Sequence, residues 1–141
     1  MTEHSFEHTI QISFGDCDPA GIVFYPNFFA WFDATYHAWL RSRGLTHANL
    51  AEAIGTIGTG LIDAGASFRS PATNGDRLSV RLTVTEWREK TFHLSYRGQI
   101  GDRLVLEGHE VRGVFMREAD GRLRAGLVAP LRQLLESRTA G

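Results

Sequence analysis

Two aspartates stand close together in a short segment that is rich in turn-forming residues. Asp16 and Asp18 lie within residues 15–21, which also hold two glycines and a proline, and a long apolar pattern begins soon after at Pro26. The N-terminus of a helix offers unpaired backbone N–H groups that can polarise a carbonyl, and a nearby carboxylate can act as base or nucleophile. The segment is therefore a candidate acyl-transfer site. The alternative is that both aspartates only close a turn or cap a helix.

A second candidate is the charged run Arg88-Glu89-Lys90, which follows a strongly alternating strand pattern. Arginine and lysine at an exposed strand end can bind phosphate without burying charge. The alternative is an ordinary solvated hairpin end. Cys17 has no evident base in its sequence neighbourhood, which favours a small packed thiol over a nucleophile. The six histidines and the one cysteine do not indicate a metal site.

Hydrophobic periodicity predicts the elements that must position these residues. Along residues 26–43, apolar side chains recur at i, i+3 and i+4, which predicts one long helix that is buried on more than one side. Gly44 is placed to end that helix. Strands are predicted at 9–14, 57–68, 77–84, 92–97 and 104–116, and short helices at 46–54 and 130–138. We expect the last strand to be bulged at Gly108 or Gly113.

A long apolar helix with several long antiparallel strands predicts an α+β fold in which the sheet curls around the helix. The 141 residues fit one domain, residues 1–141, and no repeat or linker divides them. Open edges on such a sheet favour pairing between subunits.

Composition and charge narrow the class of protein. The formal net charge of −1 gives no bulk basic field for nucleic acid or an anionic membrane, so an anionic ligand needs a local basic cluster. A single cysteine allows no intramolecular disulfide, which suits a reducing compartment. Residues 1–8 are polar and lack the apolar core of a signal peptide, and no apolar run approaches the ~20 residues of a membrane span. We therefore expect a cytoplasmic protein.

The aspartate segment resembles the active-site signature of the 4-hydroxybenzoyl-CoA thioesterases, a branch of the hotdog superfamily. The main match is Gly15-Asp16-Cys17-Asp18-Pro19-Ala20-Gly21-Ile22-Val23 followed by Tyr25-Pro26-Asn27. Weaker matches are Trp31, Asp33, Ala66-Ser67-Phe68, Glu86-Trp87-Arg88 and Lys90. The related branch tied to the Tol–Pal system usually has histidine where this chain has Pro26, which favours the hydroxybenzoyl-type branch.

The resemblance implies a hotdog fold and a set of roles. Asp18 would attack the thioester carbonyl or activate water, and the backbone N–H of Tyr25 would polarise the carbonyl, whereas Asp16 would be structural. Arg88 and Lys90 would meet the phosphates of coenzyme A, although Glu89 makes this hairpin less basic than is usual in the family. No metal or redox cofactor is implied. A homodimer or homotetramer with sites between subunits is implied.

The expected function is hydrolysis of an aryl-CoA thioester, 4-hydroxybenzoyl-CoA or a related benzoyl-CoA, to the free acid and coenzyme A. A thioesterase for short aliphatic acyl groups and a non-catalytic acyl-CoA-binding module are the alternatives. The aromatic residues Phe24, Tyr25, Phe28 and Phe29 lean toward an aryl acyl group, but core packing explains them equally well.

Overall fold

The structure is a computed structural model that describes residues 5–138, so part of the polar segment at residues 1–8 lies outside the described residues. In chain order its elements are β1 (Ser5–Gln11), the short 3-10 helix η1 (Phe14–Asp16), α1 (Pro26–Ser42), α2 (His47–Ile54), β2 (Leu61–Phe68), β3 (Arg77–Trp87), β4 (Phe92–Ile100), β5 (Arg103–Arg112), β6 (Val114–Arg117), β7 (Leu123–Gly126) and α3 (Ala129–Glu136). None of the helices in this range has the length and apolar character that a membrane span requires.

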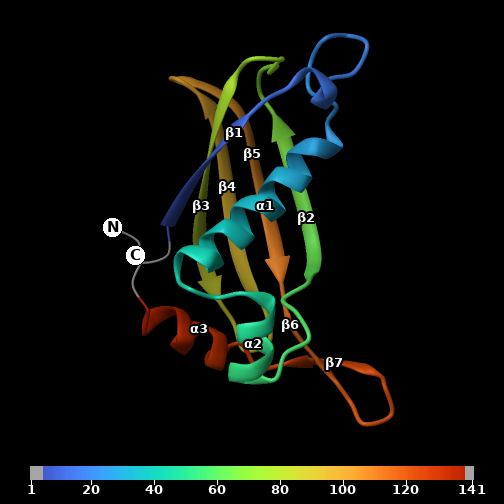
Figure 1. Ribbon diagram of the computed structural model, residues 1–141, viewed down its shortest axis with the longest axis vertical. Helices are drawn as coiled ribbons and strands as arrows, with labels where there is room; N and C mark the ends of the chain where they lie inside the picture. The colour runs from blue at the N-terminus through green and yellow to red at the C-terminus, as the bar shows by residue number, and fades with distance from the viewer. Residues whose placement is uncertain (1–4, 139–141) are drawn as a thin grey trace.

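Five strands form one antiparallel sheet in the order β1-β3-β4-β5-β2, and α1 crosses one face of it (Figure 1). The alternation predicted at 77–84 is realised in β3, where Leu78, Val80 and Leu82 are fully buried. On the neighbouring β4, Tyr96 lies opposite Leu82 and Leu94 lies opposite Val84, and both β4 residues are also buried. The structure thus confirms the α+β arrangement of an antiparallel sheet around one long helix.

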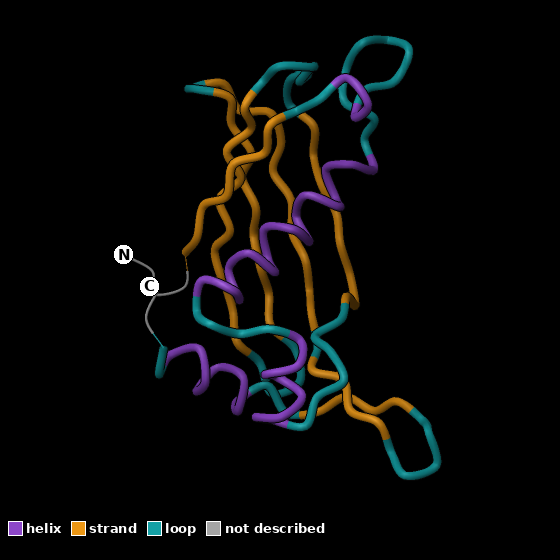
Figure 2. The backbone as a smooth tube through the Cα atoms, in the orientation of Figure 1, coloured by secondary structure: helices purple, strands orange, loops and turns teal. Residues whose placement is uncertain are grey.

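Helix α1 forms where its apolar periodicity predicts it. Pro26 occupies its first position, where the missing N–H costs no hydrogen bond. Phe28, Phe32, Tyr36 and Trp39 follow at intervals of three and four, and all four are buried against the sheet. This face holds the helix diagonally across the strands, as the backbone trace shows (Figure 2).

Gly108 is not the site of a bulge, in contrast to the prediction. The ring of Phe32 stacks on that of Tyr96 with centroids 4.4 Å apart. A Cβ atom on Gly108 would collide with the same Phe32 ring. The glycine is therefore required for close approach of helix and sheet. The irregularities of the two ladders that β5 forms fall elsewhere, at Leu61/Asp63 and Gly98/Gln99.

The predicted strand 104–116 is in fact two strands that belong to different sheets. β5 ends at Arg112, and beyond Gly113 the chain leaves the main sheet as β6, which pairs with β7 in a projecting hairpin (Figure 2). The backbone N–H of Gly113 donates to the carbonyl of Gly60, 3.0 Å away. Long-range backbone pairing of this kind also holds Gly58 against Phe115, so β2 begins at Leu61 instead of residue 57.

The first strand is also shifted from its predicted position. It spans Ser5–Gln11 instead of residues 9–14, and residues 14–16 form the turn η1. The edge strand β2 is the most exposed strand of the main sheet. It leaves the apolar side chains of Leu61, Ile62 and Phe68 about half exposed.

Candidate active site

Asp16 builds the loop that precedes α1. Its Oδ2 accepts hydrogen bonds from the backbone N–H of Ser13 at 2.9 Å and from the Ser13 hydroxyl at 3.0 Å. Its backbone carbonyl accepts from the N–H of Phe24 at 2.9 Å and from the side-chain amide of Asn27 at 2.8 Å. The Asp16 carboxylate thus has local structural partners, in line with the structural role that the resemblance implies.

Asp18 is only partly used by the turn in which it sits. Its Oδ1 accepts from the backbone N–H of Ala20 at 2.8 Å, and its own N–H donates to the carbonyl of Ile22 at 2.9 Å. Its Oδ2 has no hydrogen-bond partner among residues 5–138, and the side chain is half-buried. The turn alternative therefore accounts for one carboxylate oxygen and leaves the other available.

Tyr25 offers an unused backbone donor directly before α1. It is the N-cap residue, and within the described residues its N–H donates to no acceptor. Pro26 has no N–H, and the N–H groups of Asn27 and Phe28 donate to the carbonyls of Phe24 and Tyr25. The Tyr25 N–H therefore remains as a donor at the positive end of the helix dipole, where it can polarise a carbonyl oxygen.

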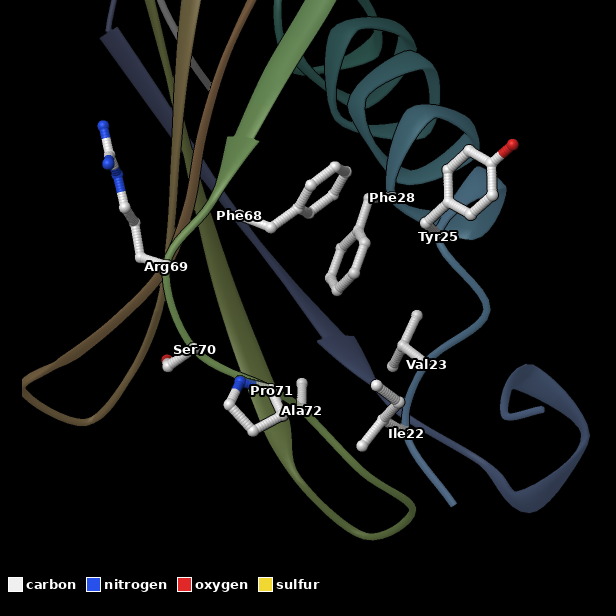
Figure 3. A pocket seen from close by; sticks show the side chains of 9 residues that line it. All are labelled: Ile22, Val23, Tyr25, Phe28, Phe68, Arg69, Ser70, Pro71 and Ala72. Atoms are coloured by element: carbon white, nitrogen blue, oxygen red, sulfur yellow. The ribbon is translucent and has the colours of Figure 1, made fainter. Parts of the chain in front are cut away.

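An apolar cavity of about 350 Å³ lies beside this donor (Figure 3). Its lining residues are Ile22, Val23, Tyr25, Phe28, Phe68, Arg69, Ser70, Pro71 and Ala72. The rings of Phe28 and Phe68 lie 5.7 Å apart between centroids, whereas the Arg69 side chain points away from them. This volume is at the lower end of the ~300–1,000 Å³ of small-molecule sites, and the lining favours an apolar group.

Cys17 lies between the two aspartates and is half-buried against the core. Among residues 5–138, its thiol makes one polar contact, a long one from Sγ to the carbonyl of Ser13 at 3.7 Å. The geometry agrees with the packed thiol that the sequence favours. Within residues 5–138, no group of three His, Cys, Asp or Glu side chains is placed to hold a metal ion.

Arg88 and Lys90 lie in the turn between β3 and β4, at the opposite end of α1 from Asp18. The strand register shows how far apart the two regions are. The first residue of β3 pairs with the last residue of β1, just before the aspartate loop, whereas the hairpin follows Trp87 at the other end of β3. The 17-residue helix between the two regions is ~25 Å long. The carbonyl of Glu89 accepts from the N–H of Val128 before α3, and Arg88 donates to Glu86 at 2.9 Å. One chain therefore does not bring these basic residues to Asp18 and Tyr25.

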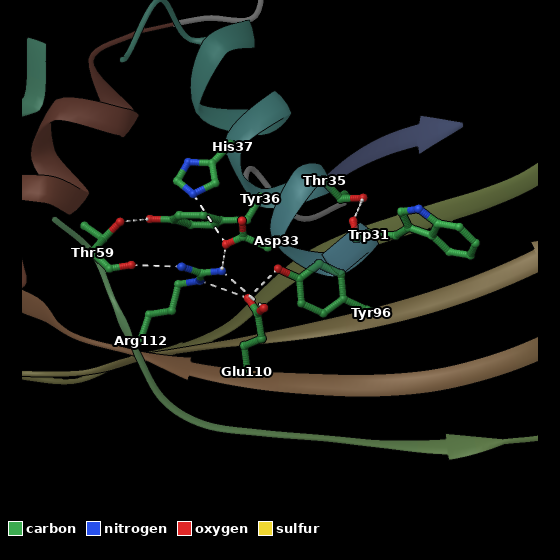
Figure 4. A network of polar contacts seen from close by, with 9 residues as sticks. All are labelled: Trp31, Asp33, Thr35, Tyr36, His37, Thr59, Tyr96, Glu110 and Arg112. Carbon is green, nitrogen blue, oxygen red and sulfur yellow. Dashed lines mark hydrogen bonds and ion pairs between the residues drawn. The ribbon is translucent and has the colours of Figure 1, made fainter. Parts of the chain in front are cut away.

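A buried polar network under the middle of α1 was missed by the sequence reasoning (Figure 4). Arg112 and Glu110 are each about 2% exposed, and Arg112 Nε donates to Glu110 Oε1 at 2.9 Å. Arg112 Nη2 also donates to Asp33 Oδ1 on the helix at 3.0 Å, and its guanidinium lies 3.9 Å from the centre of the Tyr36 ring. The Tyr96 hydroxyl donates to Glu110 Oε1 at 2.6 Å.

Burial keeps the two tyrosine hydroxyls of the network protonated. Burial raises the pKa of Tyr36 to about 12, so its phenol is neutral near pH 7. Burial and the adjacent Glu110 carboxylate likewise raise the pKa of Tyr96. A signal was present in the sequence, because Glu110 and Arg112 alternate in phase with Leu106 and so fall on the core face of their strand.

Comparison with known proteins identifies the family. The family model described as the thioesterase-like superfamily matches residues 12–132. The 4-hydroxybenzoyl-CoA thioesterase of a Pseudomonas species is 37% identical over 82% of this chain and 85% of its own length. The solved structure of that thioesterase superposes with a TM-score of 0.83 and 34% identity, over 93% of this chain and 99% of its own. The 1,4-dihydroxy-2-naphthoyl-CoA thioesterase of Synechocystis superposes with a TM-score of 0.79 and 26% identity, over 93% and 95% of the two chains.

The chain therefore belongs to the thioesterase-like superfamily and has the hotdog fold. It is a thioester hydrolase. The resemblance to the 4-hydroxybenzoyl-CoA thioesterase family, drawn from residues 15–27, is confirmed.

Proposed function

We propose that the protein hydrolyses aryl-CoA thioesters, with Asp18 as its catalytic carboxylate and the Tyr25 N–H as the donor to the carbonyl oxygen. The observation that carries this proposal is that two unused groups stand on either side of residues 22 and 23, which line the apolar cavity. Asp18 keeps one carboxylate oxygen without a partner among the described residues, and Tyr25 keeps its N–H. Both flank the Ile22 and Val23 segment that lines the apolar cavity of about 350 Å³.

Two routes start from this geometry. In the first, an Asp18 oxygen bonds to the thioester carbonyl carbon, the C–S bond breaks, and coenzyme A leaves as the thiolate. Water then cleaves the resulting anhydride and restores the carboxylate. In the second, Asp18 takes a proton from water as the water attacks the carbonyl carbon. The C–S bond then breaks, and Asp18 returns that proton as coenzyme A leaves as the thiol, so that the free acid and the Asp18 carboxylate remain. In both routes the negative charge that develops on the carbonyl oxygen is stabilised by the Tyr25 N–H at the helix start.

The relatives support an aryl acyl group. One is named a 4-hydroxybenzoyl-CoA thioesterase, another a 1,4-dihydroxy-2-naphthoyl-CoA thioesterase, and a structural neighbour at 26% identity a gentisyl-coenzyme A thioesterase. A further solved structure, 33% identical to this chain, is of an Asp-to-Asn mutant of 4-hydroxybenzoyl-CoA thioesterase in complex with 4-hydroxybenzoyl-CoA. We propose 4-hydroxybenzoyl-CoA or a related benzoyl-CoA as the substrate of this chain. The 37% identity to the first relative and the two facing phenylalanines of the cavity support that choice.

The substrate proposal is tested by kcat/KM measured on a panel of thioesters. The panel contains 4-hydroxybenzoyl-CoA, benzoyl-CoA, 1,4-dihydroxy-2-naphthoyl-CoA and butyryl-CoA. We expect the benzoyl esters to have the highest values. A highest value for butyryl-CoA would replace the aryl proposal by the short aliphatic one, and no hydrolysis of any ester would favour a binding module.

We further propose that the protein acts as a homodimer or homotetramer, in which Arg88 and Lys90 of one subunit meet the nucleotide end of the coenzyme A bound at another. Two observations support this. First, within one subunit the hairpin at residues 88–90 and the Asp18 loop lie at opposite ends of α1. Second, the edge strand β2 has unpaired backbone groups and leaves Leu61, Ile62 and Phe68 half exposed. Light scattering at micromolar concentration tests the assembly. A fully active monomer would contradict both the assembly and the shared site.

A further inference from the structure

A second cavity lies at the other end of α1, where the helix meets α2. Its volume is about 240 Å³, below the ~300 Å³ at which sites for drug-sized ligands begin. It has an apolar part formed by Leu40, Leu45 and Leu50, all three of which are buried. Such a cavity suits a small ligand with an apolar portion.

The polar part of this cavity is basic. His37 and Arg41 come from adjacent turns of α1, and His47 comes from the start of α2. No aspartate or glutamate is among the residues that line the cavity. The chain as a whole has a net charge of −1, so this concentration of basic side chains is local.

The three basic side chains differ in how they are paired. His37 Nε2 lies 3.4 Å from Oδ1 of Asp33, and the same oxygen already accepts from Arg112 at 3.0 Å (Figure 4). The guanidinium of Arg41 makes no hydrogen bond or ion pair with any other described residue. His47 packs toward the backbone of Gly58 and makes no polar side-chain contact with residues 5–138. The side-chain N–H groups of Arg41 and His47 are therefore available to donate to a ligand.

We propose that this cavity binds a small organic carboxylate, whose charged group is held by Arg41 and His47 and whose apolar part packs on Leu40, Leu45 and Leu50. Arginine suits this role because its planar guanidinium binds a carboxylate in bidentate fashion. The site is separate from the one near Asp18, because it lies at the C-terminal end of α1. The proposal rests on the cavity alone and does not depend on the proposed function.

Benzoate, the neutral benzamide of the same shape, and inorganic phosphate are the probes. Each is titrated into ¹⁵N-labelled full-length protein, and the amide resonances of Gly58 and Thr59, which line this cavity, are followed together with those of Ile22 and Val23 at the other cavity. This separates binding at the α1–α2 cavity from binding near Asp18. We expect benzoate to shift Gly58 and Thr59 in a saturable way, and benzamide and phosphate to shift them little.

Two variants test whether Arg41 binds the negatively charged group of the ligand. Arg41→Gln should weaken the benzoate affinity read at Gly58 and Thr59 about tenfold, since glutamine has neither the positive charge nor the planar donor fork that binds a carboxylate in bidentate fashion. Arg77→Gln is the matched control, because Arg77 is also exposed but lies at the other end of the molecule. It should bind like the unaltered protein. The proposal would be overturned if the Arg41→Gln and Arg77→Gln proteins bound benzoate equally well. It would also be overturned if benzamide or phosphate bound as tightly as benzoate, or if benzoate did not shift Gly58 and Thr59.

Discussion

The middle of α1 and its N-terminal end handle polar groups in opposite ways. Under the middle of the helix, Arg112 and Glu110 are buried, paired with each other and tied to the helix through Asp33. At the N-terminal end, Asp18 and the Tyr25 N–H each keep an unused hydrogen-bonding group. A buried polar group without a partner is costly, so the paired groups lie inside, whereas the half-buried Asp18 and the exposed Tyr25 can keep unpaired groups. We infer that the buried network holds the middle of the helix in place, whereas the groups before its N-terminus are left to meet a ligand.

The largest effect is expected from breaking the buried network. Arg112→Met should lower the free energy of unfolding by about 3–5 kcal/mol, because it leaves the Glu110 carboxylate buried without its cation. Urea denaturation measures this loss. The double variant Glu110→Leu/Arg112→Met is the control and should be more stable than Arg112→Met alone, since no buried charge remains unpaired. If the single variant is as stable as the unaltered protein, the network does not hold the helix.

The next largest effect is expected at Asp18, near the N-terminus of α1. It should lower the rate of hydrolysis and leave the stability of the protein nearly unchanged. Asp18→Asn should lower kcat by ~10²-fold or more, because the amide can act neither as base nor as nucleophile. Its midpoint of thermal unfolding should stay close to that of the unaltered protein, since an amide oxygen can still accept from the Ala20 N–H. Near-normal kcat on the best substrate would show that the site is misassigned.

A smaller effect is expected at the far hairpin. The double variant Arg88→Ala/Lys90→Ala should raise KM for a full coenzyme A ester and leave kcat nearly unchanged, because exposed phosphate contacts act on ground state and transition state alike. The loss should be about 1 kcal/mol per charge or less. Added salt should raise KM for the full ester in the same way as the substitution. The KM for a truncated thioester without the nucleotide should change with neither.

Two results would contradict the phosphate-binding role. An unchanged KM for the full ester would mean that the hairpin is only a solvated surface. A fall in kcat with the truncated thioester as well would mean that Arg88 and Lys90 support the fold near the site.

The smallest effect is expected at Cys17, next to the candidate catalytic carboxylate. Cys17→Ala should keep most of the activity and lose about 1 kcal/mol of stability or less, since only a half-buried thiol is removed. Steady-state kinetics and thermal unfolding measure the two quantities. Mass spectrometric detection of an acyl group on the Cys17 sulfur during turnover would contradict the packed-thiol interpretation.

The sequence by itself determined the elements whose signals are local. The repeat of Phe28, Phe32 and Trp39 at helical spacing placed α1 almost to the residue, and strict alternation placed β3. The signature from Gly15 to Asn27 also identified the family, because its loop residues and the helix start that follows lie in one unbroken segment. In each case the partners that define the pattern are only a few residues apart.

Tertiary structure decided the rest, since it depends on contacts between segments far apart in the chain. Gly113 ends β5 because its N–H pairs with Gly60, and Gly108 is needed because the Phe32 ring packs on it. The burial of Arg112 likewise becomes favourable only when Glu110 and the helix residue Asp33 converge on it. Only the three-dimensional arrangement showed that the hairpin at residues 88–90 lies at the opposite end of α1 from Asp18. A strand pattern gives the length of a strand but not which end faces the helix start, because hydrogen bonding between strands sets their direction.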